Sequence, residues 1–180
     1  NTQDQRMQPF WPNQSEDRLS LIQRDLEQAH LVLGLPGLSF GEEDRLALSA
    51  MSTLLGGGMS SRLFQEAREK RGLCYSVFSF SQSFSDSGVM AIYAGTSQED
   101  AAQMVQLIGQ ELCDVAAHAG VDETNRAIAQ MRASLLMQQE SVSNVAETLA
   151  RQRLIVGRLI SPQEWLDRID ALTPNDMQRV

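Results

Sequence analysis

The sequence has little of what metal sites, disulfide frameworks and membrane spans are built from. Its 180 residues include only two histidines and two cysteines. The cysteines, Cys74 and Cys113, lack CxxC spacing, which excludes a zinc ribbon or a disulfide framework and predicts two reduced, semi-buried side chains. No apolar run approaches the roughly eighteen residues of a membrane span, and no basic-then-apolar signal segment opens the chain. We therefore expect no membrane partner.

Neither histidine has the surroundings of a metal ligand. His30 begins an apolar run with no second ligand nearby, so a core or edge histidine that bonds to backbone is the simpler interpretation. His118 falls in the last turn of a predicted helix, where a cation complements the helix dipole. A catalytic zinc needs three protein ligands and an open position. The sequence therefore predicts no metal site and no cofactor in this chain.

The composition is that of an acidic globular protein. A hydrophobic content of 42% and a charged content of 21% are ordinary, and a chain of this length buries a substantial core as one domain. The net charge of −8 argues against nucleic acid as a partner. Residues 1–17 are polar and predict a leader or linker, followed by a single domain over residues 18–180. The first residue is Asn, and a helix start at Thr173-Pro174 has few residues after it, so we expect a truncated fragment of a longer chain.

Hydrophobic periodicity and turn residues predict the order of the elements. An extended pattern begins at Arg18, and the apolar run over residues 29–35 predicts a strand buried on both faces. A helix over 42–55 with an acidic first turn and a short helix from about 62 to Gly72 are predicted next, followed by a hairpin of strands over 74–83 and 88–95. A longer helix is then capped within 96–100 and ended by Gly120. The next helix is capped by Asp122, breaks near 140–144 and continues to Gly157, and Ser161-Pro162 begins the helix after it. Helices segregated to one face of a mainly antiparallel sheet make a two-layer α+β fold.

The chain is organised around a glycine-rich stretch, Gly56-Gly57-Gly58, which joins two predicted helices. A phosphate cradle would need a Walker lysine, or dinucleotide spacing after a strand, and neither is present. Three glycines lose much entropy on ordering, so we expect a mobile or exposed loop. Ser60 or Ser61 is placed to accept a hydrogen bond from the free N–H groups of the next helix. On that helix, Arg62 with Glu66 and Glu66 with Lys70 are spaced for surface ion pairs.

The residues that follow carry a resemblance to a known family. Residues 56–66, Gly-Gly-Gly-Met-Ser-Ser-Arg-Leu-Phe-Gln-Glu, and 68–76, Arg-Glu-Lys-Arg-Gly-Leu-Cys-Tyr-Ser, resemble the second, non-zinc domain of pitrilysin/insulinase-family metallopeptidases. The mitochondrial processing peptidase-like bacterial branch is the most similar, and the resemblance runs from about Asp25 to the last residue. It implies the same α+β architecture. It also implies that zinc belongs to the first domain of the parent protein, on a His-x-x-Glu-His motif that this chain lacks.

The resemblance further implies that this domain contributes residues to the active site. The family's second domain supplies an arginine and, seven residues later, a tyrosine, which match Arg68 and Tyr75. Tyr75 would support the oxyanion, and Arg68 with the glycines at 56–58 would contact substrate. From spacing alone, Arg68 is instead a solvated helix residue and Tyr75 a core aromatic at the start of a strand.

The expected function is therefore the substrate-binding C-terminal half of a zinc-dependent endopeptidase, inactive alone, that acts on extended peptides or presequences. A strand edge near 29–35 or 74–80 is suited to pair with a peptide backbone. The alternative is a non-catalytic structural or regulatory subunit of the same family. Expected partners are a peptide substrate, a zinc-bearing sister domain or subunit, and a second copy of the chain. We expect a bacterial cytoplasmic location, with the periplasm or the mitochondrial matrix also compatible.

Overall fold

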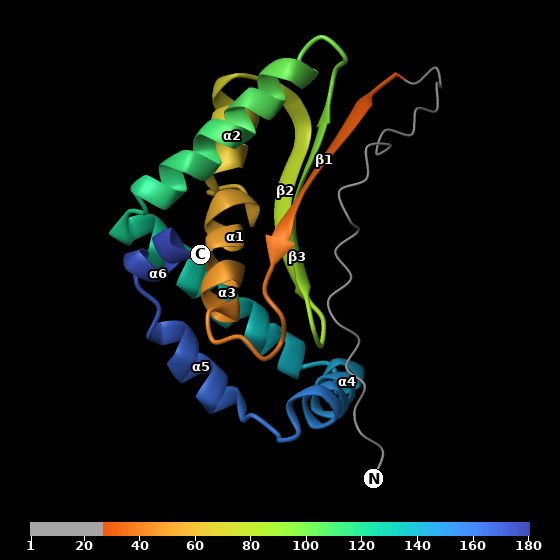
Figure 1. Cartoon of the computed structure of the whole chain (residues 1–180), viewed down its shortest axis with the longest axis vertical. Helices are drawn as coiled ribbons and strands as arrows, with labels where there is room; N and C mark the ends of the chain where they lie inside the picture. Colours follow the sequence, from red (N-terminus) through yellow and green to blue (C-terminus); the bar gives the residue numbers. More distant parts are fainter. Residues whose placement is uncertain (1–26) are drawn as a thin grey trace.

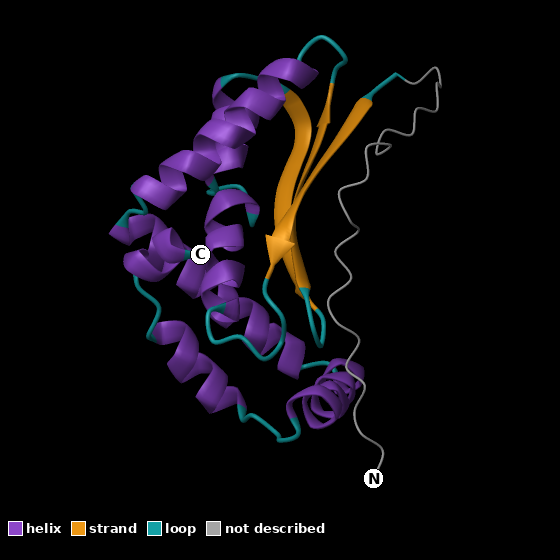
Figure 2. Cartoon of the chain, in the orientation of Figure 1, coloured by secondary structure: helices purple, strands orange, loops and turns teal. Residues whose placement is uncertain are grey.

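The computed structural model describes residues 27–180, in which helices cover one face of a three-stranded antiparallel sheet (Figures 1 and 2). The strands are β1 (Ala29–Gly37), β2 (Cys74–Ser83) and β3 (Gly88–Thr96), in the order β1-β3-β2. The expected hairpin of β2 and β3 and the α+β class are confirmed. The predicted linker over residues 1–17 and the extended pattern from residue 18 lie outside the described residues.

Strand β1 is not buried on both faces, and that prediction is wrong. Leu31 and Leu33 pack against the core, whereas His30 is exposed and Val32 is 66% exposed. In the described sheet β1 pairs only with β3, and the helices cover one face (Figure 2). The apolar run therefore supplies both a core-facing row and an open row.

The helices follow the predicted order with shifted boundaries. They are α1 (Arg45–Gly56), the π-helical η1 (Phe64–Lys70), α2 (Ala101–Ala117), α3 (Val121–Gln139), α4 (Val142–Arg151), the π-helical η2 (Gln152–Val156), α5 (Pro162–Asp170) and α6 (Pro174–Arg179). The expected break between α3 and α4 is confirmed, and Ser141 caps α4 by accepting from Asn144 N–H. The expected cap at Ser161 is also confirmed, since its hydroxyl accepts from Glu164 N–H at 3.1 Å.

Three helix starts differ from the prediction. Helix α1 begins at Arg45 without an acidic first turn, because Glu42 accepts from Ser39 N–H at 2.7 Å in the preceding turn. Ser97 rather than Thr96 accepts the Asp100 N–H before α2, because the Thr96 hydroxyl donates to Leu73 O. Helix α3 has Gly120 rather than Asp122 as its N-cap. The predicted start at Thr173-Pro174 is confirmed, and the six-residue helix that follows is stabilised by a Thr173–Asp176 capping box.

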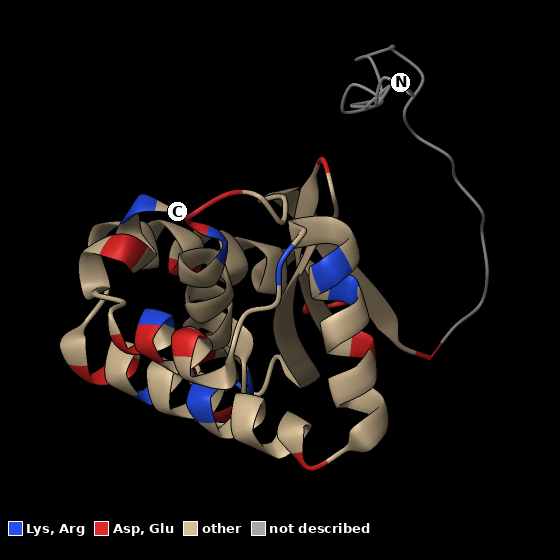
Figure 3. Ribbon diagram, turned by 90° about the horizontal axis from the view of Figure 1, so that it is seen from below, with Lys and Arg blue, Asp and Glu red and all other residues tan. Residues whose placement is uncertain are grey.

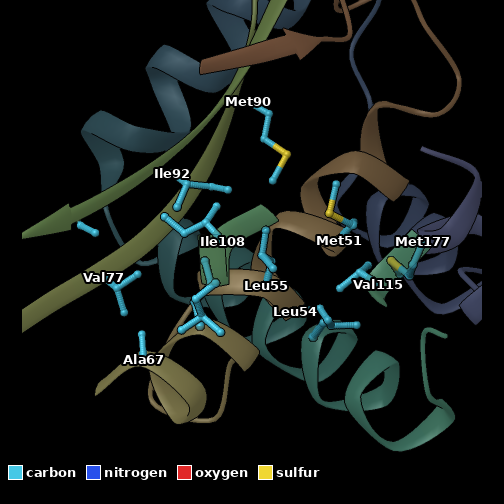
Figure 4. Packing of buried hydrophobic residues seen from close by; sticks show 14 of the residues in the cluster. Met51, Leu54, Leu55, Ala67, Val77, Met90, Ile92, Ile108, Val115 and Met177 are labelled. Carbon is cyan, nitrogen blue, oxygen red and sulfur yellow. The ribbon is translucent and has the colours of Figure 1, made fainter. Parts of the chain in front are cut away.

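The core lies between the sheet and the helical layer, with α1 at its centre. Helix α1 contacts β2 on one side and α2, α3 and α6 on others. Figure 4 shows side chains from α1, β3, α2 and α6 that meet in this layer; the fully buried ones include Leu55, Met90, Ile92, Ile108 and Met177. This packing fixes the end of α1, from which the glycine stretch and η1 continue.

None of the helices over residues 27–180 is both long and apolar enough to cross a bilayer.

Candidate functional site

The glycine stretch is held in place by hydrogen bonds and close packing. Gly56 is the last residue of α1 and is buried, Gly57 is half-buried, and only Gly58 is exposed. Gln130 of α3 donates to Gly57 O, and the Ser61 hydroxyl donates to Gly58 O at 2.6 Å. The expectation of a mobile or exposed loop is therefore wrong for Gly56. The expectation that a serine hydroxyl accepts from the next helix is also wrong, because η1 has Leu63 as its N-cap and no side-chain cap bond.

Arg62 fixes the start of the next helix. Its guanidinium donates to Glu123 at 2.8 and 2.5 Å, to Asp114 at 2.5 Å and to His118 O at 2.6 Å. The predicted Arg62–Glu66 pair is thus replaced by long-range partners, while the Glu66–Lys70 pair is present at 2.5 Å. Arg62 therefore ties η1 to the end of α2 and the start of α3.

The Arg62 cluster shifts the protonation of its members. The hydrogen bond with Glu123 raises the pKa of Arg62 above its ordinary value. Burial by itself would raise the pKa of Glu123, but the bonds from Arg62 and from Gly120 N–H outweigh it and lower that pKa below the usual range. The pair is therefore charged at neutral pH.

The structure brings Arg68 and Tyr75 together at the end of η1. Gly72 ends this helix at φ +63°, as its predicted position after the helix requires, and β2 begins two residues later. The Arg68 guanidinium lies 4.8 Å from the Phe64 ring centroid and 5.8 Å from that of Tyr75. Both site residues are exposed, and Tyr75 is 79% exposed. The interpretation of Tyr75 as a core aromatic is therefore wrong.

A β-bulge accounts for the exposure of Tyr75. The register with β3 shifts here, since Cys74 lies opposite Thr96 while Ser76 lies opposite Gly95. Tyr75 is the additional residue, so Cys74 turns into the core and Tyr75 remains in solvent. Nothing in the local sequence marks this bulge, because it depends on pairing with a strand some twenty residues away.

The two cysteines are both free, as predicted. Cys74 is buried, and burial raises the pKa of its thiol, an effect that the Arg68 charge partly offsets. Cys113 is exposed, so the expectation of a semi-buried side chain is wrong for it. Cys74 beside the site is therefore a neutral packing residue at neutral pH.

The sequence interpretation missed an aromatic row on the open face of the sheet. The Tyr93 ring stacks on Phe78 at 4.8 Å, and its hydroxyl lies 2.8 Å from His30 Nδ1. His30 therefore bonds to a side chain rather than to backbone as predicted. Sheet register places His30, Gly95 and Ser76 in one row, directly beside Tyr75.

The residues present do not fit a catalytic zinc. Within residues 27–180 no three His, Cys, Asp or Glu side chains gather closely enough to hold a metal ion. His30 contacts Tyr93, and His118 lies 3.3 Å from Asp114 on the far end of α2. The arrangement at Arg68 and Tyr75 offers a cation and a phenol to a ligand, both from the protein surface.

Comparisons with known proteins show the family and the fold of the chain. A family model described as the peptidase M16 inactive domain matches residues 1–131. An uncharacterized zinc protease of Streptomyces coelicolor is 41% identical over 164 residues, which are 91% of this chain and 36% of that protein. A protease from Helicobacter pylori has a TM-score of 0.74 at 26% identity, over 86% of this chain and 38% of the other. A structure of a peptidase M16 inactive domain from Pseudomonas fluorescens has a TM-score of 0.76 at 23% identity, over 86% and 37%. The chain thus spans a little over a third of the length of these proteins.

Proposed function

Because the chain belongs to the peptidase M16 inactive-domain family, we propose that it forms the substrate-binding C-terminal half of a zinc-dependent endopeptidase. The observation that carries this proposal is the exposed Arg68–Tyr75 pair. The guanidinium lies over the Phe64 ring, the phenol faces solvent beside it, and both side chains are exposed. Polar groups that are exposed side by side are suited to contact a ligand.

In this proposal each residue has a separate part in substrate binding. The Arg68 guanidinium presents parallel N–H donors to a substrate carbonyl or carboxylate. The Tyr75 hydroxyl donates to the carbonyl oxygen of the scissile bond, and this bond strengthens as negative charge develops there. The Gly56–Gly58 stretch is the third predicted substrate contact, and exposed Gly58 is its most accessible residue. The zinc and the general base would belong to a sister domain or subunit, since the residues of this chain do not fit the metal.

The described sheet also suits an extended peptide. In residues 27–180, β1 and β2 each pair with β3 alone, which leaves their outer edges without a strand partner. An extended peptide or presequence would add to such an edge through backbone hydrogen bonds. Substrates of this kind, and the bacterial cytoplasmic location expected above, remain predictions.

The test is kinetic and uses the full enzyme that contains this domain. Tyr75→Phe keeps the ring and should lower kcat by about 10²-fold with little change in KM, because the hydroxyl acts mainly in the transition state. Arg68→Ala should also raise KM, because a cation that holds substrate acts in the ground state too. Tyr93→Phe and Arg71→Ala serve as matched controls and should leave both constants near their original values.

Unchanged kcat and KM in both Tyr75→Phe and Arg68→Ala would overturn the proposal. The alternative, a structural or regulatory subunit of the same family, would then be favoured. Folding is checked separately by thermal unfolding, which Tyr75→Phe should barely alter because the residue is exposed.

A further inference from the structure

A second candidate site lies in the helical layer, away from Arg68 and Tyr75. Helices α3, α4 and α5 lie together at one end of the molecule (Figure 1). With η2 and residues of α1 they line a half-open cavity of about 710 Å³. Neither Arg68 nor Tyr75 lines it. The volume falls within the range of about 300–1,000 Å³ that is typical of small-molecule sites.

Arg45 gives this cavity an unneutralised positive charge. Its guanidinium lies 5.1 Å from the Phe40 ring centroid and 5.2 Å from that of Trp165. Among residues 27–180, no carboxylate lies within ion-pair distance of this group, and no hydrogen bond uses its N–H donors. The aromatic faces attract the cation, but they accept no hydrogen bonds from its five N–H groups, which lie in the plane of the guanidinium.

The neighbouring arginines differ from Arg45 because each has a carboxylate partner. Arg151, which also lines the cavity, pairs with Glu147 at 2.6 Å. Arg168 lies 5.7 Å from the centroid of the same Trp165 ring and pairs with Glu164 at 3.1 Å. Burial lowers the pKa of Arg45, and the charge of Arg168 lowers it further. An anion bound in the cavity would offset both the burial of the Arg45 charge and its repulsion by Arg168.

The rest of the wall is mixed: hydrocarbon surface alternates with hydroxyl and amide groups and with the Arg151–Glu147 pair. Leu135 of α3, Ile155 and Val156 of η2 and Ile169 of α5 supply hydrocarbon surface, and Gln138 supplies an amide. The η2 segment is π-helical, a distortion that is often found at functional sites. A cation beside such a wall matches a ligand with a charged head and an apolar body.

We propose that this cavity binds a small organic carboxylate with an apolar body. The carboxylate pairs with Arg45, in the planar two-bond geometry that a guanidinium favours, and the hydrocarbon packs on Leu135 and Ile155. Two sources share this chemistry: a free carboxylic acid of medium chain length, and the C-terminal carboxylate of a short apolar peptide. The proposal is independent of the function assigned to Arg68 and Tyr75.

The first experiment leaves the cavity unaltered. The Trp11→Phe chain has Trp165 as its single tryptophan, which makes its fluorescence a reporter of the site. Octanoate should change this fluorescence saturably, and octanamide should bind at least about tenfold more weakly, because it lacks the charge that pairs with Arg45. Equal binding of the two, or no saturable response to octanoate, would overturn the proposal.

Variants then test Arg45 itself. Arg45→Met should weaken octanoate binding at least about tenfold, and Arg45→Lys should retain part of it because the charge remains. Arg126→Met, an exposed arginine outside the cavity, is the matched control and should bind as the parent does. Circular dichroism checks that each variant is folded. A folded Arg45→Met chain with the original octanoate Kd would contradict the assignment.

Competition distinguishes the two sources. Trileucine with a free carboxylate and its C-terminal amide are added to the octanoate complex. Displacement by the acid alone identifies a peptide carboxylate as an accepted ligand. If neither displaces octanoate while octanoate still binds through Arg45, the site takes a free carboxylic acid.

Discussion

Gly56 sets the distance between helix α1 and strand β2. A Cβ atom at this position would lie 2.5 Å from Ser79 N and 2.7 Å from Ser79 Oγ. The Ser79 hydroxyl in turn donates to Ser52 O at 2.6 Å, which fixes the strand against the helix. The glycine is therefore required by close backbone approach, because its φ is not positive.

We predict that Gly56→Ala destabilises the fold by about 1–3 kcal/mol, the usual cost of overpacking where neither backbone can withdraw. Gly58→Ala is the matched control, since its Cβ would meet only the Gln130 side chain at 3.5 Å. Urea unfolding of the two variants measures the difference. Equal stability of Gly56→Ala and Gly58→Ala would show that α1 and β2 separate without cost.

Glu123 links stability to pH through Arg62. Its pKa in the folded state lies below the ordinary value of 4.5, chiefly because hydrogen bonds from Arg62 and Gly120 outweigh the effect of burial. A depressed pKa means that the unfolded chain binds the proton more readily. The stabilisation is therefore complete well above pH 4.5 and is lost as the pH falls through the lower, folded value.

We predict that Glu123→Gln lowers the free energy of unfolding at pH 7 by about 1–3 kcal/mol, because the amide weakens two charged hydrogen bonds. The difference from the parent should narrow below pH 4.5, where the parent loses the same charge. Exposed Glu69→Gln is the control. Urea unfolding series at neutral and acidic pH test this, and a difference that stays constant with pH would contradict the linkage.

At the scale of elements, Gly72 determines how η1 passes into β2. Its φ of +63° lies in the left-handed region, and no atom lies within 4 Å of a Cβ built there. Any effect of substitution is therefore conformational rather than steric. The reversal at this residue places Arg68 beside Tyr75.

We predict that Gly72→Ala destabilises the fold by about 1–2 kcal/mol, the cost of a left-handed conformation for an L residue. Gly72→Asn should cost less, because asparagine tolerates this region better. Thermal and urea unfolding compare the two variants. If alanine and asparagine were equally harmful, the cause would not be the backbone conformation.

Signals that lie within a few residues of a helix end were predicted from the sequence. Gly72 and Gly157 end their helices in the left-handed conformation, and Ser161 caps α5, because each signal acts on adjacent backbone. Helix α2 shows the limit: Val105 lies at helical spacing from buried Ile108 yet is 42% exposed, whereas Met104 and Leu107 are buried. Two stripes one residue apart both have helical spacing, and only packing against the sheet selects between them.

The residues of the candidate site were proposed from the sequence, whereas their geometry was not. The seven-residue spacing of Arg68 and Tyr75 is present in the sequence, and their proximity follows from η1 and Gly72. The bulge that exposes Tyr75 requires the register of β2 against β3, which is a tertiary property. Arg45 carried no local signal either, since Trp165, which it contacts, lies 120 residues later.

At the scale of the whole molecule, the charge of residues 27–180 is confined to the helices and loops. No Asp, Glu, Lys or Arg occurs in β1, β2 or β3, although the chain has a net charge of −8, and Figure 3 shows the strands free of charged residues. One face of this uncharged sheet packs on the helices. On the other, Val32, Phe78 and Phe80 remain 66%, 45% and 43% exposed within the described residues.

An apolar sheet face with two strand edges that lack a partner in the described residues favours association. We predict that the chain self-associates at high micromolar concentration and that Phe80→Lys shifts it toward monomer, because a buried lysine at such an interface would lose its hydration. Val142→Lys is the matched control, since Val142 is 84% exposed on α4, away from the sheet. Sedimentation velocity over a concentration series measures both variants. Association that Phe80→Lys leaves unchanged, or that Val142→Lys abolishes equally, would place the contact on the helical layer instead of the sheet.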